Sequence, residues 1–295
     1  MNEFKTLAEF LKAFNSEEAC RKHFEVIRFA DGDFCPHCKH DKINRFTDGK
    51  RYRCAKCKQD FTIKTGTIFG ESKLPIQKWF IAIYLLTTRK KGISSIELSK
   101  QVGVSQKTAW FMDHRIREAM KQGKGKLIGV VEADETYLGG YHPQKHGFSK
   151  KSAIMGMTER GGEIRAFSIP NRETHVILNA LTENVDRDAH LITDDAGVYR
   201  KTARVGYRHD SVKHSRKQYV KKGNIHTNSI ESFWALFKRN YHGTYHHMSK
   251  KHLQKYIDEV SFRFNNREVE MNHLFNEVTK LIAKRGKISY KTLTA

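Results

Sequence analysis

The sequence predicts a multidomain protein of mixed α+β and α/β class, with a small ribbon, a helical segment and a mixed sheet in that order. Three observations support this. Two C-x2-C pairs lie near the N-terminus, two helix patterns joined at a glycine follow them, and strands and helices alternate from residue 127. At 295 residues the chain exceeds one typical domain. We expect an N-terminal helix and ribbon over 1–70, a helical segment over 71–122, a sheet domain over 127–275 and a C-terminal tail over 276–295.

The charge balance is strongly basic. Lys and Arg number 54 against 32 Asp and Glu, which gives a formal net charge of +22. Such a chain attracts polyanions, above all nucleic acid, although a basic surface can also serve solubility alone. The longest apolar stretch, 79–86, is far shorter than the ~20 residues that span a bilayer, and the N-terminus lacks a secretory signal pattern. We therefore expect a cytoplasmic protein that binds double-stranded DNA and no membrane.

Four of the five cysteines form two pairs, Cys35 with Cys38 and Cys54 with Cys57, separated by fifteen residues. This spacing is typical of zinc ribbons, in which four thiolates complete a tetrahedral shell. Two disulfides are the alternative, which a reducing cytosol disfavours. We predict one structural Zn²⁺ that supplies much of the folding energy of the ribbon. Cys20 lies outside the pairs in a helical pattern, where we expect a buried free thiol.

Local patterns predict the elements around the cysteines. Residues 42–54 read as a hairpin that turns at Asp48–Gly49, and 61–69 read as a strand. Pro75 opens a helix with an apolar stripe at helical spacing. The stripe consists of Ile76, Trp79, Phe80, Ile83 and Leu86.

Residues 93–120 read as two short helices joined at Val102–Val104, with Ser105 placed to cap the second. The pattern resembles a helix-turn-helix, although such pairs also occur as plain packing units. In the DNA-binding form the second helix lies in the major groove. It would present Gln106, Lys107 and either Trp110 or His114 to the DNA.

From residue 127 the patterns predict three strands connected by hairpins, then a helix and a further strand. The segments are 126–138, 152–160, 163–170, 174–185 and 189–195. This order opens a ribonuclease H-like fold, a mixed sheet flanked by helices.

Acidic residues mark this predicted sheet. Glu132 and Asp134 alternate with apolar residues in the first strand and therefore share a face, although only one of them need be a metal ligand. Asp194 ends a later strand, at the edge where α/β sheets place their sites. If the two strands are parallel neighbours, Asp134 and Asp194 can face one ion. A third acid, Glu231, starts a predicted helix, where a capping box with Asn228 is the alternative.

Five segments in order carry a family resemblance. They are VEADETYLGG, LITDDAGVY, HTNSIESFWALFKR, YHGTYHHMSKKHLQKYIDE and VSFRFNNRE. Together they resemble the catalytic domain of bacterial insertion-sequence transposases with an Asp-Asp-Glu triad. FNSEEACRKHFEVIRFADGDFCPHC is similar to the start of the group that carries an N-terminal zinc ribbon. The resemblance covers nearly the whole chain.

The resemblance implies a triad of Asp134, Asp194 and Glu231, with Lys238 in the accompanying basic position. Asp195 stays an alternative to Asp194. Three carboxylates can bind two Mg²⁺ or Mn²⁺ ions, for which oxygen ligands are suited. The resemblance further implies strand cleavage at the ends of a mobile element, joining of the freed 3′-hydroxyl to target DNA, and at least a homodimer.

Two basic runs are candidate DNA contacts. Residues 200–222 contain nine Lys or Arg and one Asp, and 141–151 add three Lys and two His. Phosphate contacts there would make binding strongly salt-dependent, whereas a solvated loop is the alternative. The candidates are Lys150, Lys151, Arg216, Lys217, Lys221 and Lys222. Two other functions fit less well: a nuclease or resolvase that cuts without joining, and a zinc-ribbon DNA-binding regulator, which would have a broken triad.

Overall fold

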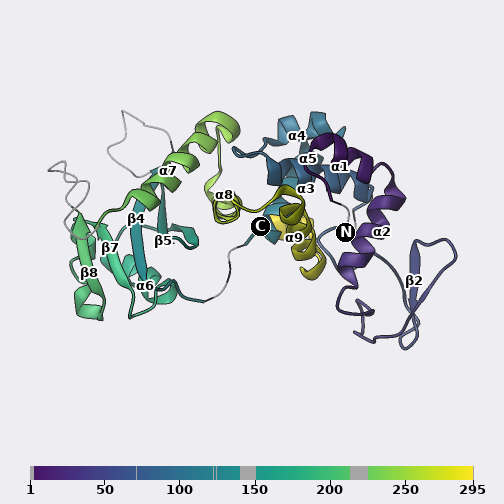
Figure 1. Ribbon diagram of the computed structural model, residues 1–295, viewed down its shortest axis with the longest axis horizontal. Helices are drawn as coiled ribbons and strands as arrows, with labels where there is room; N and C mark the ends of the chain where they lie inside the picture. Colours follow the sequence, from purple (N-terminus) through teal and green to yellow (C-terminus); the bar gives the residue numbers. More distant parts are fainter. Residues whose placement is uncertain are drawn as a thin grey trace. The chain divides into compact units, whose positions relative to one another are not determined.

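The computed structural model describes residues 3–70, 72–121, 123, 125–139, 151–212 and 225–294. The chain divides into two compact units. The first combines Met1–Met120 with Glu268–Ala295, and the second is Lys121–Arg267. Figure 1 shows the helices of the first unit and the central sheet of the second.

The first unit is built on a cluster of helices. These are α1 (Leu7–Ala13), α2 (Glu17–Arg28), α3 (Ile76–Thr88), α9 (Met271–Lys284) and α10 (Tyr290–Thr294). Phe275 of α9 lies at the centre of an aromatic cluster, with its ring centroid 5.2 to 5.5 Å from those of Phe4, Phe10, Phe14 and Phe80. Such pairs add stabilisation beyond the area they bury. The predicted stripe of α3 is buried as well, and so is Cys20, a free thiol.

Helix α9 differs from the expected division of the chain, which ended the sheet domain at 275 and left 276–295 as a tail. The helix runs across that boundary and belongs to the first unit. Its apolar face, including Leu274, Phe275 and Val278, is buried. An amphipathic pattern shows that one face of a helix is buried, but it does not identify the surface that covers it. The sequence alone could not assign α9 to the N-terminal unit.

A three-stranded antiparallel ribbon carries the cysteines. Its strands are β1 (Ile43–Arg45), β2 (Arg51–Cys54) and β3 (Asp60–Thr62), in that order. The predicted hairpin turns at Asp48, whose Oδ1 accepts from the backbone N–H groups of Lys50 and Arg51 at 2.9 and 3.1 Å. Gly49 has a φ of 58°, a left-handed conformation that glycine adopts without strain. The strand expected over 61–69 is shorter, because the chain turns after Thr62.

The two helices predicted over 93–120 are present as α4 (Ser95–Val102) and α5 (Gln106–Ala119). Gly103 ends α4 with a φ of 66°, and the Ser105 hydroxyl accepts from the backbone N–H of Thr108 at 3.2 Å. Lys78 of α3 donates to the carbonyl of Gly103 at 2.7 Å. The turn between the helices is thereby fixed to the body of the first unit.

The second unit contains a mixed five-stranded sheet. Its strands are β4 (Val130–Leu138), β5 (Ser152–Glu159), β6 (Ile164–Ile169), β7 (His190–Asp194) and β8 (Arg208–Val212). Their order is β6-β5-β4-β7-β8, with β4 antiparallel to β5 and parallel to β7. The predicted ribonuclease H-like arrangement is confirmed.

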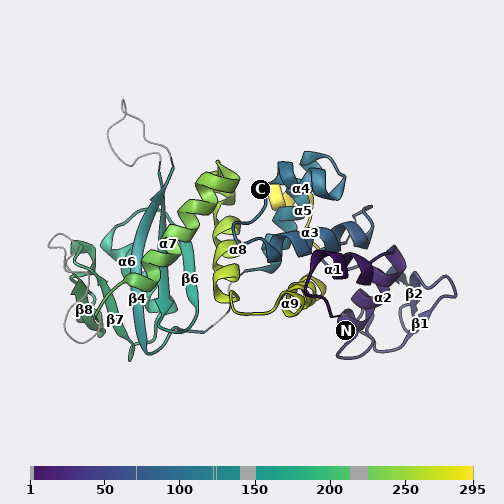
Figure 2. The same cartoon turned by 45° about the horizontal axis from the view of Figure 1, so that its top comes forward.

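Helices cover both faces of this sheet, and Figure 2 shows α7 running across one of them. On one face α6 (Thr174–Asn184) packs on odd-numbered residues of β4, including Val131 and Ala133. On the other, α7 (Asn228–Asn240) and α8 (Leu253–Asn265) pack on even-numbered residues of β5 and β6. Short turns connect these elements: η2 (Gly197–Tyr199), η3 (Ala203–Val205), η5 (Tyr241–Tyr245) and η6 (Lys250–His252). Side chains of β4 therefore alternate between α6 and α7.

Across the described ranges, no helix has the length and apolar character needed to cross a membrane.

Candidate metal centres and active site

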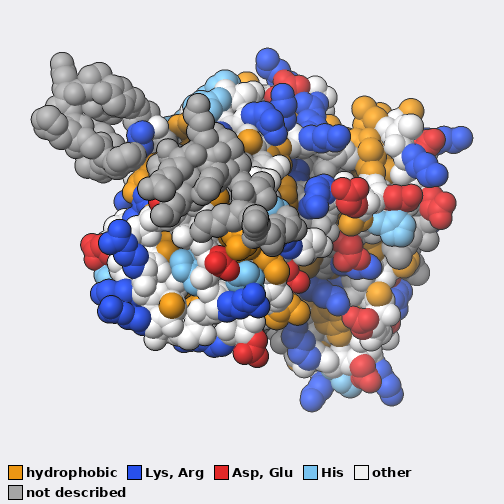
Figure 3. All heavy atoms as spheres, turned by 60° about the vertical axis from the view of Figure 1, so that its left-hand side comes forward, with side chains coloured by type: hydrophobic (Ala, Val, Ile, Leu, Met, Phe, Trp, Pro, Cys, Tyr) orange, Lys and Arg blue, Asp and Glu red, His pale blue; other side chains and the backbone are white. Residues whose placement is uncertain are grey.

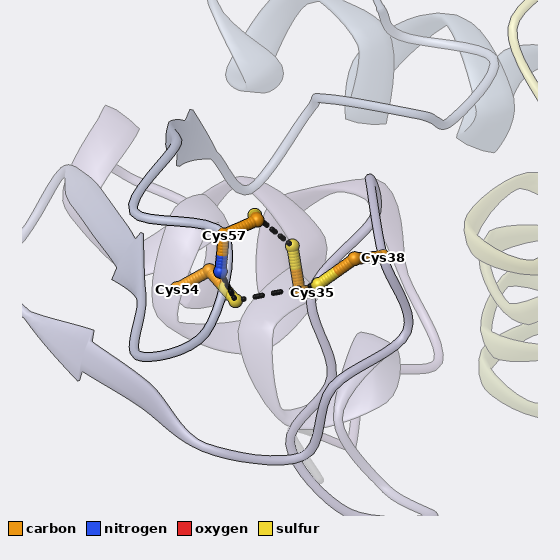
Figure 4. Close-up of side chains that lie close together, drawn as sticks. All are labelled: Cys35, Cys38, Cys54 and Cys57. Carbon is orange, nitrogen blue, oxygen red and sulfur yellow. Dashed lines mark hydrogen bonds between the residues drawn. The ribbon is translucent and has the colours of Figure 1, made fainter.

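The four paired cysteines converge, and their sulfur atoms all lie within 4.8 Å of one another. Figure 4 shows the side chains pointing toward one another, with 3.7 Å between the sulfurs of Cys35 and Cys57 and 3.5 Å between those of Cys38 and Cys54. No two are joined by a disulfide. Four thiols at these separations suit a tetrahedral Zn²⁺, so the residues fit the predicted structural zinc site.

Both cysteine pairs are shaped by the same local turn. The residue after each pair, Lys39 and Lys58, has a positive φ of 62° and 58°. Backbone N–H groups of His37 and Cys57 lie 3.4 Å from the sulfurs of Cys35 and Cys54. Amide donors directed at sulfur favour the thiolate form that zinc requires.

Asp134 and Asp194 come from neighbouring parallel strands. The last paired positions of β4 and β7 are Glu132 and Ile192, and each aspartate follows two residues later. Side chains alternate along a strand, so both carboxylates lie on the face that α7 covers. The predicted adjacency of the two strands is thus present.

The surroundings of Asp134 disfavour its negative charge. Burial raises the pKa of this carboxyl to about 6, and the nearby charges of Glu135 and Asp194 add to the rise. The indole Nε1–H of Trp234 donates to its Oδ2 at 3.0 Å and acts in the opposite direction. Carboxylates held together against repulsion are an arrangement that a divalent cation stabilises, so the donor set fits Mg²⁺ or Mn²⁺.

Glu231 occupies the first turn of α7, three residues before Trp234. The N-cap is Thr227, so the capping box with Asn228 considered from the sequence is not formed. The Glu231 carboxylate instead accepts from the Thr227 hydroxyl at 2.8 Å. Lys238, seven residues on, is exposed on the same helix. Within the described residues only the cysteines bring three or more ligand atoms within 4.8 Å, so the three acids are not gathered that closely.

Glu132, the other acid of this face, is fully buried and has many partners. Its Oε2 accepts from the backbone N–H groups of Ser229 and Ile230 at 2.8 and 3.2 Å. Its Oε1 lies 3.0 Å from Nε of Arg160 and 3.1 Å from the Ser229 hydroxyl. Periodicity identified the face of Glu132, but its partners left no sequence signal, because Arg160 is 28 residues away and Ser229 and Ile230 are 97 and 98 residues away.

Glu135 lies on the opposite face of β4 and connects to the turn that follows Asp194. Its Oε1 accepts from the Tyr199 hydroxyl, and its Oε2 lies 2.6 Å from Nη2 of Arg172. Tyr199 belongs to η2, five residues beyond Asp194. This network, which the sequence did not indicate, fixes the connection after β7 to the strand that bears Asp134.

Gly156 of β5 allows α7 to approach the sheet at this point. It pairs with Asp134 across the strands. A Cβ atom added at Gly156 would lie 2.6 Å from Cζ2 of Trp234 and 2.8 Å from Cδ1 of Ile230, both in α7. Glycine is required here because the helix rests directly on the strand.

The two consecutive aspartates have different environments. Asp194 is half-buried at the end of β7, and its Oδ1 accepts from the backbone N–H of Ala196 at 3.1 Å. Asp195 is exposed. The acid that caps the turn is thus Asp194.

The candidate DNA contacts fall into three groups. Gln106 and Lys107 are exposed at the start of α5. His114 is fully buried, with its ring centroid 4.1 Å from that of Trp110, which corrects its expected exposure. His114 lies about two turns into α5, on the side of the helix that is buried. Lys151 is half-buried before β5. The others, Lys150, Arg216, Lys217, Lys221 and Lys222, lie outside the described residues.

Basic side chains lie on the described surface of the second unit, as Figure 3 shows. Around the connection from β7 to β8, four cations of the predicted basic run are exposed: Arg200, Lys201, Arg204 and Arg208. Such a surface favours contact with a phosphate backbone.

Comparisons with known proteins agree with this architecture. Residues 126–265 match the family model of the ISXO2-like transposase domain, and residues 15–60 match that of the transposase zinc-ribbon domain. The chain is 27% identical over 275 residues to an uncharacterized protein in transposable element ISH50 of Halobacterium salinarum, across 86% of this chain and 92% of the relative. It is 26% identical over 102 residues to an uncharacterized transposase-like protein of Haemophilus influenzae, across 35% of this chain and 80% of that relative.

The two family matches fall on separate parts of the fold. The zinc-ribbon match contains all four paired cysteines, and the transposase-domain match contains the whole five-stranded sheet with α6, α7 and α8. The chain therefore belongs to the transposases that carry an N-terminal zinc ribbon and an ISXO2-like transposase domain.

Proposed function

We propose that the protein is a DNA transposase of the Asp-Asp-Glu type, which cleaves strands at the ends of an insertion sequence and joins the freed 3′-hydroxyl to target DNA. The pair of carboxylates on β4 and β7, beneath the helix that bears Glu231, is the observation that carries this proposal. Its support is the position of that pair within the matched transposase domain.

Each site residue has a distinct role in the proposed chemistry. Asp134, Asp194 and Glu231 would hold two Mg²⁺ or Mn²⁺ ions, which would supply activation of the attacking oxygen and stabilisation of the leaving one. Trp234 orients Asp134 by donating to one carboxylate oxygen, and the other oxygen is left to bind a metal ion. Lys238, exposed two turns beyond Glu231, contacts a phosphate of the bound strand.

DNA binding is assigned to other parts of the chain. Gln106 and Lys107 start the second helix of the helix-turn-helix pattern, where base contacts are made in that motif. Lys151, with Lys150, Arg216, Lys217, Lys221 and Lys222, is assigned to the phosphate backbone. Because two element ends react together, we infer that the active form is a homodimer or larger.

A cleavage assay on a labelled duplex that carries the inverted repeat flanking the gene tests the site. With Mg²⁺ or Mn²⁺, the wild type should nick the repeat end. Asp134→Ala and Glu231→Ala should abolish nicking while leaving affinity for the duplex nearly unchanged. Asp195→Ala is the matched control and should cleave like the wild type.

The outcomes separate the candidate roles. Metal-dependent cleavage by Asp134→Ala would mean that the site is elsewhere. Loss of cleavage in Asp195→Ala, with activity retained in Asp194→Ala, would show that Asp195 rather than Asp194 is the second metal ligand. Binding of the repeat with no cleavage by the wild type would favour a DNA-binding regulator instead.

A further inference from the structure

We propose that Glu132 is a positioning residue, which holds α7 and thereby sets Glu231 at the correct distance from Asp134. The proposal rests on the proposed function of these two acids as metal ligands. It concerns the acid on the α7 face of β4 whose two oxygens are both already engaged by the protein.

The carboxylate of Glu132 acts as the N-terminal cap of α7. The N-cap residue Thr227 makes no side-chain capping bond to the helix backbone. Free N–H groups at the start of a helix need an acceptor, and a negative charge is favourable there. Glu132 meets this need by accepting from the second and third residues of α7, Ser229 and Ile230.

Arg160 and the segment before α7 complete the contact. Nε of Arg160 donates to Glu132, and Nη2 of the same guanidinium donates to the carbonyl of His226 at 3.0 Å. The His226 ring nitrogen Nδ1 lies 3.3 Å from Glu132 Oε1. One buried carboxylate thus connects β4, the end of β5 and the chain entering α7.

Two links fasten α7 to β4, and Glu231 lies between them along the helix. The first is Glu132 with Ser229 and Ile230, and the second is Asp134 with Trp234. Glu132 and Asp134 are two residues apart on one face of the strand, about 6.6 Å. The spacing of the strand is therefore matched to one turn of the helix, and the position of Glu231 follows from both links.

Replacing Glu132 by glutamine is the informative change, because it keeps the shape and removes the charge. Backbone N–H groups face one oxygen, and Arg160 faces the other. A glutamine NH₂ group therefore meets a donor in either orientation. We expect the start of α7 to shift, so that Glu231 is displaced while the sheet and its core persist.

The test measures metal affinity directly, by titrating the full-length zinc-loaded protein with Mn²⁺ and following free Mn²⁺ by electron paramagnetic resonance. Glu132→Gln is compared with the wild type and with Asp134→Ala. The matched control is Glu259→Gln, a fully buried glutamate of α8 that accepts from Tyr245 and pairs with Arg263. Thermal unfolding of each variant reports stability separately.

We expect Glu132→Gln to bind Mn²⁺ about 10- to 100-fold more weakly than the wild type, the range typical of residues that orient metal ligands. Raised Mn²⁺ should partly restore its cleavage rate. Glu259→Gln should keep wild-type Mn²⁺ affinity even if its stability drops. If Glu132→Gln loses stability alone and retains Mn²⁺ affinity, the proposal is overturned, and Glu132 serves only folding.

Two further outcomes remain decisive. If Glu132→Gln does not fold, Glu132→Asp replaces it, because aspartate keeps the charge and retracts it by one methylene. A loss of Mn²⁺ affinity in Glu132→Asp, smaller than the 10- to 100-fold expected for Glu132→Gln, supports the proposal. Unchanged Mn²⁺ affinity in Glu132→Asp overturns it. If the wild type binds Mn²⁺ through Asp134 but never cleaves DNA, the proposed function fails, while the affinity of Glu132→Gln still decides the role of Glu132.

Discussion

Three acids on one strand, Glu132, Asp134 and Glu135, have three different environments within four consecutive residues. Alternation along β4 turns the first two toward α7 and the third toward α6. Glu132 is satisfied by the start of α7, and Glu135 by Tyr199 and Arg172. Asp134 has the indole of Trp234 as a donor to one oxygen and like charges nearby. Glu132 and Glu135 thus fix the positions of the elements that surround Asp134.

Gly156 provides a direct test of this close packing. Gly156→Ala places a methyl group in the space of Trp234 and Ile230, so α7 must move away from the sheet. We expect a loss of about 1 to 3 kcal/mol in unfolding free energy, measured in urea, and a larger relative loss of metal-dependent cleavage. Gly243→Ala, which has open space around it, is the control. Wild-type stability and cleavage in Gly156→Ala would show that α7 does not need this close approach.

Period-two alternation and strand ends are local signals, and they placed Glu132, Asp134 and Asp194 in the sheet. Glu132 and Asp134 share a face for that reason. The choice of Asp134, Asp194 and Glu231 as ligands came from the family resemblance. The partners of these residues could not be foreseen, since Trp234 and Ser229 lie about 100 residues away and only the tertiary fold brings them together. The sequence likewise did not show which side of α5 is buried, and for that reason His114 was expected to face DNA.

The N-termini of helices α3 and α7 are capped in the same way. In each, a glutamate from a distant segment accepts the first free N–H groups of the helix. Glu17 of α2 does so for Ile76 and Gln77 of α3 at 2.8 and 2.9 Å. Helices that rely on a remote cap are placed by tertiary contacts as well as by their own sequence. Pro75 alone marked where α3 begins, but its orientation depends on Glu17.

Helix α9 should be required for the N-terminal unit rather than for the sheet. Phe275→Ala removes the ring at the centre of the aromatic cluster, which typically costs about 3 to 5 kcal/mol. Hydrogen exchange measured by mass spectrometry should then show faster exchange in α2 and α3 and unchanged exchange in the sheet of the second unit. Glu277→Ala, an exposed change in the same helix, should have little effect. Loss of protection confined to the sheet would contradict this placement of α9.

The contact between α2 and α9 also predicts a pH dependence. His23 Nε2 lies 2.9 Å from Asn276 Oδ1, and burial lowers the pKa of His23 despite that hydrogen bond. In the unfolded chain histidine titrates near ~6.5. The unfolded state therefore takes up a proton first as pH falls, so stability present above ~6.5 is lost progressively below it.

The measurement for His23 is the difference in unfolding free energy between pH 7.5 and 5.5, compared between wild type and His23→Gln. Zinc thiolates also take up protons in acid, and that contribution is common to both proteins. The wild type should lose more stability than His23→Gln over this range. Equal losses would show that His23 contributes nothing to the pH dependence.

At the scale of the whole molecule, the zinc ribbon and the five-stranded sheet depend on different sources of stability. The ribbon has three short strands and little core, whereas the five-stranded sheet is covered on both faces. Chelation of one Zn²⁺ per chain should therefore expose amides of residues 35–62 to exchange, with the sheet of the second unit unaffected. Confirmed loss of zinc with full protection of the ribbon would mean that the metal does not stabilise it.

The proposed function requires that one site in the second unit both cuts and joins DNA. The most direct measurement supplies a duplex already cleaved at the repeat end, with a free 3′-hydroxyl, together with plasmid target and Mg²⁺ or Mn²⁺. The wild type should produce joined product, and Asp134→Ala should produce none while still binding the duplex. Absence of joined product from a wild-type preparation that cleaves the intact repeat end would contradict the claim and identify a nuclease that does not join DNA.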